Sequence, residues 1–165
     1  QTASGLRFKG YAQALKAHGI EVDDRLVAQG YFTYHSGLDA ADQLLTLRRR
    51  PTALFASNDD MAAAAIAVAH RQGLDVPRDL TIVGFDDTAL ASTVWPPLTT
   101  IRQPVAEMSR EAVSVLVDAI RRKADGQPGL AARELMGFAL IRRQSDGHPP
   151  AEPGAPPARA RKAAS

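Results

Sequence analysis

Apolar and polar residues alternate along this chain with two spacings, one typical of helices and one typical of buried strands. Apolar residues that recur every three or four positions predict helices over residues 4–18, 36–48, 58–72 and 105–123. Short runs rich in β-branched and other apolar residues predict strands over residues 25–32, 52–56, 80–85, 99–103 and 134–142. Because the two kinds of element alternate, the pattern predicts an α/β protein with a parallel sheet and helices on both of its faces.

Residues at the ends of the predicted helices agree with these boundaries. Ser36 is a candidate N-cap for the second helix, and Asn58 or Asp59 is one for the third. Gly19 and Gly73 stand where the first and third helices are expected to stop.

The most informative segment runs from residue 80 to residue 103. Its first strand ends at Gly84, and Phe85, Asp86 and Asp87 follow directly. Ligands of open α/β sheets bind beyond the carboxyl ends of the strands, so Asp86 is placed where a ligand would meet it. We interpret Asp87 as a turn or cap residue, because alternation leaves one of the two carboxylates facing the ligand.

Composition adds few constraints. The 165 residues carry a formal net charge of only +2, which does not demand a nucleic-acid surface, and they include no cysteine for disulfides or metal ligation. No apolar run approaches the roughly 18–20 residues that span a bilayer. From Ser145 onward the chain is rich in Pro, Ala, Gly and Arg, so residues 144–165 are expected to be a disordered tail.

Enzymatic motifs are not found. The carboxylate pairs at 59–60 and 86–87 have no histidine at ligand spacing, and vicinal acidic residues at helix starts are more often caps. There is no nucleophile elbow, phosphate loop or dinucleotide fingerprint. Short arginine clusters, including Arg142–Arg143, are interpreted as solvated ends. We therefore expect no enzyme activity, metal site or cofactor.

Three spaced motifs resemble one family. VGFDD (83–87), PPLTTIRQP (96–104) and FASNDDMA (55–62) are similar to the effector-binding core of the lactose/galactose repressor family of bacterial transcription regulators. The resemblance implies the two-lobed, periplasmic-binding-protein-like fold. It implies an N-terminally truncated chain, with most of one lobe in residues 1–143 and a crossover segment and helix of the other lobe at about 96–123.

The resemblance also suggests a ligand-binding set. Arg7 matches the family's effector-contacting arginine, and Phe32 matches an aromatic that stacks on the effector ring. The residues themselves add three candidates: Asn58 offers a donor and an acceptor, Asp86 can accept from two vicinal hydroxyls, and Gln103 is expected to reach the cleft from the crossover.

The residues themselves leave alternatives to each of these roles. Arg7 could be a solvated arginine, Phe32 could be core, Asn58 could cap its helix, and Gln103 could bond backbone. Two positions near Arg7 depart from the family, since Ala3 and Gly5 stand where polar residues are common.

The function expected from the resemblance is that of the ligand-sensing part of a cytoplasmic transcription regulator that forms a homodimer. A sugar or nucleoside effector would control a helix-turn-helix domain that this chain lacks, and only that domain would touch operator DNA. The alternative is a solute-binding protein of a sugar transporter. Pro96 and Pro97 are predicted to stiffen the crossover between the lobes.

Overall fold

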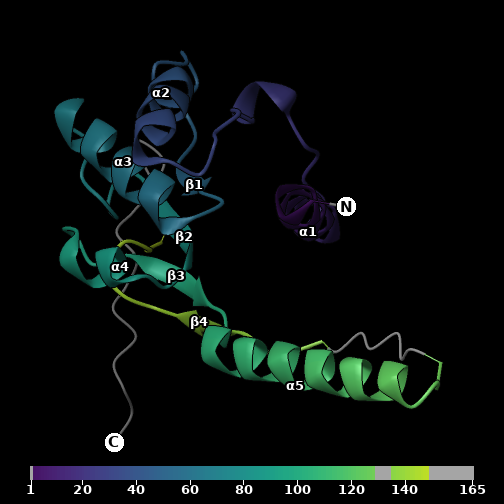
Figure 1. Cartoon of the computed structure of the whole chain (residues 1–165). Helices are drawn as coiled ribbons and strands as arrows, with labels where there is room; N and C mark the ends of the chain where they lie inside the picture. Colours follow the sequence, from purple (N-terminus) through teal and green to yellow (C-terminus); the bar gives the residue numbers. More distant parts are fainter. Residues whose placement is uncertain (1, 129–134, 149–165) are drawn as a thin grey trace, which may run out of the picture.

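The computed structural model describes residues 2–128 and 135–148. Figure 1 shows the alternation of helices and strands expected from the sequence. The elements are α1 (Ala3–Ala17), η1 (Asp24–Leu26, a 3₁₀ turn), α2 (Tyr34–Leu45), β1 (Ala53–Phe55), α3 (Asp59–Arg71), β2 (Thr81–Asp86), α4 (Ala89–Thr93), β3 (Thr99–Arg102), α5 (Val105–Ala124) and β4 (Ala139–Ile141). The four helices predicted from periodicity are confirmed, whereas the five-residue α4 is too short to show a period.

Within these residues the strands form one sheet in the order β1-β2-β3-β4. The first three strands are parallel, as predicted, and β4 runs antiparallel to β3. The antiparallel direction arises because the chain leaves the sheet at Arg102, forms α5 and returns beside the same strand, so that Arg102 pairs with Ala139.

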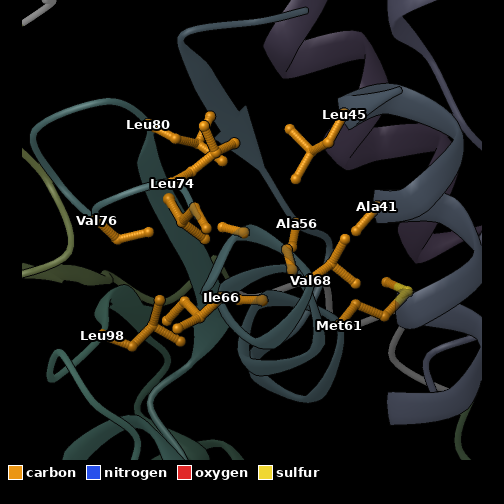
Figure 2. Close-up of a cluster of buried hydrophobic side chains, with 14 of the residues drawn as sticks. Ala41, Leu45, Ala56, Met61, Ile66, Val68, Leu74, Val76, Leu80 and Leu98 are labelled. Atoms are coloured by element: carbon orange, nitrogen blue, oxygen red, sulfur yellow. The ribbon is translucent and has the colours of Figure 1, made fainter. Parts of the chain in front are cut away.

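The core lies between the sheet and the pair α2 and α3 (Figure 2). The small side chains of α3 let it pack closely, and Ala62, Ala64 and Val68 have no exposed surface. Gly37 on α2 is required for this contact, because a Cβ there would lie 2.7 Å from the Cα of Met61. The alanine-rich sequence of α3 therefore forms the centre of the fold.

The predicted strand at 25–32 is wrong. Its first residues form the turn η1, which the Asp23 carboxylate caps by accepting from the backbone N–H of Arg25, and the rest is irregular. A strand needs a hydrogen-bonded neighbour, and no strand in the described part of the chain pairs with this segment.

β1 was expected to be buried, but it is the edge strand, so Phe55 remains 39% exposed. The predicted cap of α2 also differs. Thr33 accepts from the N–H of Ser36, and Ser36 is the third helical residue of a reciprocal capping box.

The packed part of the chain extends beyond residue 143. Ser145 is fully buried, and its hydroxyl donates to the carbonyl of Ile82 (2.6 Å) and accepts from the N–H of Thr99 (2.8 Å). Ser145 thus joins β2 to β3, which contradicts its assignment to a disordered tail. Residues 149–165 of that expected tail lie outside the described residues.

The crossover begins later than predicted. Pro96 and Pro97 lie between α4 and β3, and β3 pairs with β2 in the same sheet. The sheet register, which proline content does not reveal, places residues 99–102 in the same sheet as β2. The chain leaves the sheet only at Gln103 and Pro104.

Helices α1 and α5 bury no residue. Figure 1 shows α5 projecting away from the sheet. Its apolar side chains are 38% to 60% exposed; they are Val105, Met108, Val113, Leu116, Val117 and Ile120. Across the described residues, no helix has the length and apolar character needed to cross a membrane.

Candidate functional site

The candidate site lies at the carboxyl ends of the three parallel strands. Ser57 and Asn58 follow β1, Asp86 ends β2, and Gln103 follows β3. Parallel strands end at the same edge of a sheet, so residues far apart in sequence meet there. Arg7 reaches this edge from α1.

Asp86 is at the centre of the polar cluster. Its Oδ1 accepts from the side-chain amide of Gln103 at 2.7 Å and lies 3.5 Å from an Nη atom of Arg7. Burial raises the pKa of Asp86 above its usual value, although Arg7 and Gln103 act in the opposite direction. About a third of the side chain stays exposed, so Asp86 retains acceptor capacity toward a ligand.

Arg7 is held in a fixed orientation. It donates to the carbonyl of Ser57 at 2.5 Å, and its guanidinium carbon lies 3.8 Å from the ring centre of Phe85 and 5.8 Å from that of Phe32. Its side chain is only 16% exposed, so the alternative of a solvated arginine is wrong. Stacking on aromatic faces stabilises the cation in this position.

Phe85 was not among the predicted site residues. In a regular strand, neighbouring side chains point to opposite faces, which would direct Phe85 away from Asp86. The backbone leaves the strand conformation at Asp86, where φ is 109°, and at Asp87, where φ is 55°. No sequence signal indicates positive φ at two consecutive aspartates.

Asn58 caps α3, as one of the two sequence interpretations stated. Its side-chain Oδ1 accepts from the backbone N–H of Met61 at 3.0 Å, and its side-chain Nδ2 donates to the backbone carbonyl of Phe32 at 3.0 Å. Asn58 is buried, and it holds the loop that carries Phe32. Phe32 itself has φ of 60° and is 42% exposed, so it is not a core residue.

Asp87 lies in the turn between β2 and α4, where its φ is 55°, and it does not cap α4, whose N-cap position is Thr88. Its side chain is 5% exposed and accepts from Nε of Arg102 at 2.5 Å and from Nη2 of Arg143 at 2.6 Å. Burial alone would raise its pKa, but the hydrogen bonds from Arg143 and Arg102 outweigh burial and lower the pKa. Arg143, which was interpreted as a solvated end, is 19% exposed.

Asp59 has a structural role. It is fully buried and accepts from the N–H of Thr88 at 2.7 Å and from the hydroxyl of Thr100 at 2.6 Å. A Cβ at Gly84 would lie 2.5 Å from this carboxylate, so the glycine makes room for it. Within the described residues, no group of three His, Cys, Asp or Glu side chains is arranged to hold a metal ion.

A cavity of about 480 Å³ lies beside β1 and adjoins the cluster at Ser57. Its walls include Phe8, Tyr11 and Phe55, and of the five predicted ligand contacts only Phe32 lines it. Its other walls are mostly apolar, with Ser4, Gln29 and Ser57 among the polar residues that line it.

The cluster of Arg7, Asp86 and Gln103 combines fixed donors with a carboxylate acceptor. An ionised carboxylate accepts from two neighbouring hydroxyls, while a guanidinium and an amide donate to ring or hydroxyl oxygens. Phe32 adds an exposed aromatic face. This chemistry is suited to a small polyhydroxylated molecule.

Comparisons with known proteins agree with this arrangement. Residues 1–145 match the family described as periplasmic binding protein-like domain. The chain is 46% identical over 139 residues to the HTH-type transcriptional repressor CytR of Escherichia coli. This match covers 84% of this chain and 40% of the repressor. It is 40% identical over 120 residues to the ribose operon repressor of the same organism, covering 73% of this chain and 36% of the repressor.

Solved structures show the same similarity. The transcriptional regulator CelR in complex with cellobiose matches with a TM-score of 0.78 at 38% identity, covering 84% of this chain and 41% of that chain. The Escherichia coli transcriptional repressor ascG matches with a TM-score of 0.71 at 37% identity. The match covers 84% of this chain and 49% of the ascG chain. The chain thus spans 36% to 40% of the length of the two repressors above. These relatives favour a regulator over a transport protein.

Proposed function

Because the chain belongs to the periplasmic binding protein-like domain family found in LacI-type repressors, we propose that it is the ligand-sensing part of a bacterial transcription regulator. In this proposal a small effector binds at the carboxyl edge of the sheet. Its presence changes the affinity of the complete protein for operator DNA.

The observation that carries this proposal is the fixed cluster of Arg7, Asp86 and Gln103 at that edge. Each side chain comes from a different segment of the chain, and their hydrogen bonds and ion pair hold them together. Such preorganisation reduces the ordering cost of binding. The proposed contacts of the effector are Arg7, Phe32, Asn58, Asp86 and Gln103.

The charges around the cluster favour an uncharged effector. The carboxylates of Asp59 and Asp60 lie close enough to raise the pKa of Asp86, while Arg7 is already bonded to Ser57 and Asp86. No cation of the described cluster remains available for a phosphate. We therefore propose a neutral sugar or nucleoside rather than a sugar phosphate.

The other partners follow from the same proposal. Operator DNA would be bound by a helix-turn-helix domain outside this chain, as the name of the CytR relative indicates for that protein. A regulator of bacterial genes works in the cytoplasm, and a symmetric operator calls for a homodimer.

Substitution of Asp86 tests this function. In the complete protein, Asp86→Ala should raise the dissociation constant of the effector about a hundredfold, because an Arg7 charge loses its partner and the effector loses its acceptor. Titration calorimetry with D-ribose, cellobiose and adenosine measures the constant. Asp42→Ala, which removes an exposed carboxylate paired with Arg71, is the control and should leave it unchanged.

If Asp86→Ala bound the effector as tightly as the wild type, the carboxyl edge would not be the binding site. If no neutral compound bound but a sugar phosphate did, the proposed effector class would be wrong.

A further inference from the structure

Asp87 connects three parts of the fold that meet beside the effector cluster. It directly follows Asp86, and its two oxygens bind arginines from two other segments. Arg102 is the last residue of β3, before the chain leaves the sheet for α5. Arg143 lies two residues beyond β4, on the segment that returns from α5.

Arg143 also binds the start of β3. Its Nη1 donates to the carbonyl of Leu98 at 2.8 Å, and its backbone N–H donates to the hydroxyl of Thr99 at 2.7 Å. The segment returning from α5 is therefore fastened to the start of β3 by Arg143 and, through the same side chain, to Asp87.

The backbone at this point is strained. Asp86 and Asp87 both have positive φ, which costs energy for residues other than glycine and persists only where surrounding contacts enforce it. The nearly buried ion pairs of Asp87 are contacts of this kind. A displacement of Asp86 would consequently be passed to both arginines.

Helix α5 is the element that such a displacement would move. Arg102 and α5 are separated only by Gln103 and Pro104, and Gln103 also donates to Asp86. The exposed apolar face of α5 and the short coverage of the relatives indicate that α5 packs against residues outside this chain.

We propose that Asp87 is a positioning residue that couples effector binding at Asp86 to the placement of α5, through its ion pairs with Arg102 and Arg143. This inference rests on the proposed function, since it assigns the route by which that same site acts. Asp87 does not touch the effector. Its role is to fix both strands that flank α5 relative to Asp86.

The coupling role predicts a different defect from the loss of a ligand contact. In the complete protein, Asp87→Asn should change the dissociation constant of the effector less than tenfold. The ratio of operator affinities without and with saturating effector should fall at least tenfold. Asp86→Ala should show the opposite pattern. It should raise the dissociation constant of the effector, but at saturating effector the ratio of operator affinities should equal that of the wild type.

The experiment uses the member of the panel of D-ribose, cellobiose and adenosine that binds the wild type, with operator DNA selected from a random pool. Calorimetry gives effector affinity, and fluorescence anisotropy gives operator affinity with and without saturating effector. Arg102→Met, which releases one ion pair at a half-exposed position, is a second variant in case Asp87→Asn folds poorly.

Asp79→Asn is the matched control. Asp79 is 31% exposed in its side chain, accepts from the backbone N–H of Asp75 at 2.9 Å and pairs with Arg78, and neither contact involves Asp87 or its two arginines. It should leave operator release unchanged.

The outcomes separate the two proposals. If the wild type responds to effector and Asp87→Asn and Arg102→Met retain full release at saturation, the coupling role of Asp87 is overturned while the function stands. If Asp79→Asn lowers release as much as Asp87→Asn, the defect is one of general stability and the coupling role is also overturned. If nothing in the panel releases the wild type, the proposed function fails first and the coupling role fails with it.

Discussion

Asp86 and Asp87 are neighbours with opposite electrostatic behaviour. Burial raises the pKa of Asp86, and hydrogen bonds from Arg143 and Arg102 lower that of Asp87 despite its burial. The first carboxylate keeps part of its surface open, while the second is enclosed by two arginines. A pair of identical residues thus provides one carboxylate that stays partly open to solvent and one that is enclosed in the fold.

The lowered pKa of Asp87 makes a prediction about acid stability. A carboxylate whose folded pKa is below its unfolded value, about 3.9, contributes stability that is present above that value and is lost as pH falls through the folded pKa. Asp87→Asn should lower the unfolding free energy of the complete protein by about 2–4 kcal/mol at pH 7. Urea unfolding at decreasing pH should show this difference shrinking below about pH 4. A difference that stays constant down to pH 2 would mean that the ion pairs contribute nothing.

Most of the polar cluster could be predicted from the sequence. Asp86 and Gln103 follow strands, and strand ends meet at one edge, so their proximity follows from the topology. Arg7 came from the family resemblance. Phe85 and Arg143 could not be predicted, because one depends on positive φ at two aspartates and the other on an ion pair across 56 residues of sequence.

Among the helices, α2 and α3 depend on a close approach that a single glycine permits. Gly37→Ala should lower the unfolding free energy by about 1–3 kcal/mol, because the added methyl group would meet Met61 and the Cβ of Ala64. Gly10→Ala on α1 is a matched control, since a Cβ there has no atom within 4 Å. Alanine favours helix over glycine, so the control should be neutral or slightly stabilising. Equal effects of the two substitutions would show that α2 and α3 adjust at no cost.

Helices were easier to predict than strands for a physical reason. A helix such as α3 satisfies its hydrogen bonds within itself, and its caps and periodicity are local in sequence. A strand depends on a partner elsewhere in the chain. The segment 25–32 has the composition of a strand, but it pairs with no strand among the described residues. The exposure of Phe55 follows from the position of β1 at the edge of the sheet.

The molecule as described has a well-packed centre and two poorly packed helices. The buried residues come from α2, α3, α4, the strands and nearby loops, whereas α1 and α5 contribute none. Sequence periodicity correctly identified the apolar face of α5. Periodicity does not say what covers such a face, because that depends on residues elsewhere in the folded protein.

Local stability should follow this division. Amide exchange depends on the free energy of local opening, which is smallest where few apolar contacts are buried. In the isolated chain, amides of α1 and α5 should exchange at least tenfold faster than those of α3 and β2. In the complete protein, protection of α5 should rise towards that of α3, because its apolar face then packs against other residues. Mass-spectrometric exchange on both forms measures this, with α3 as the internal reference. If α5 in the isolated chain were as protected as α3, its apolar face would already be covered, and α5 would move with the sheet rather than with a second lobe.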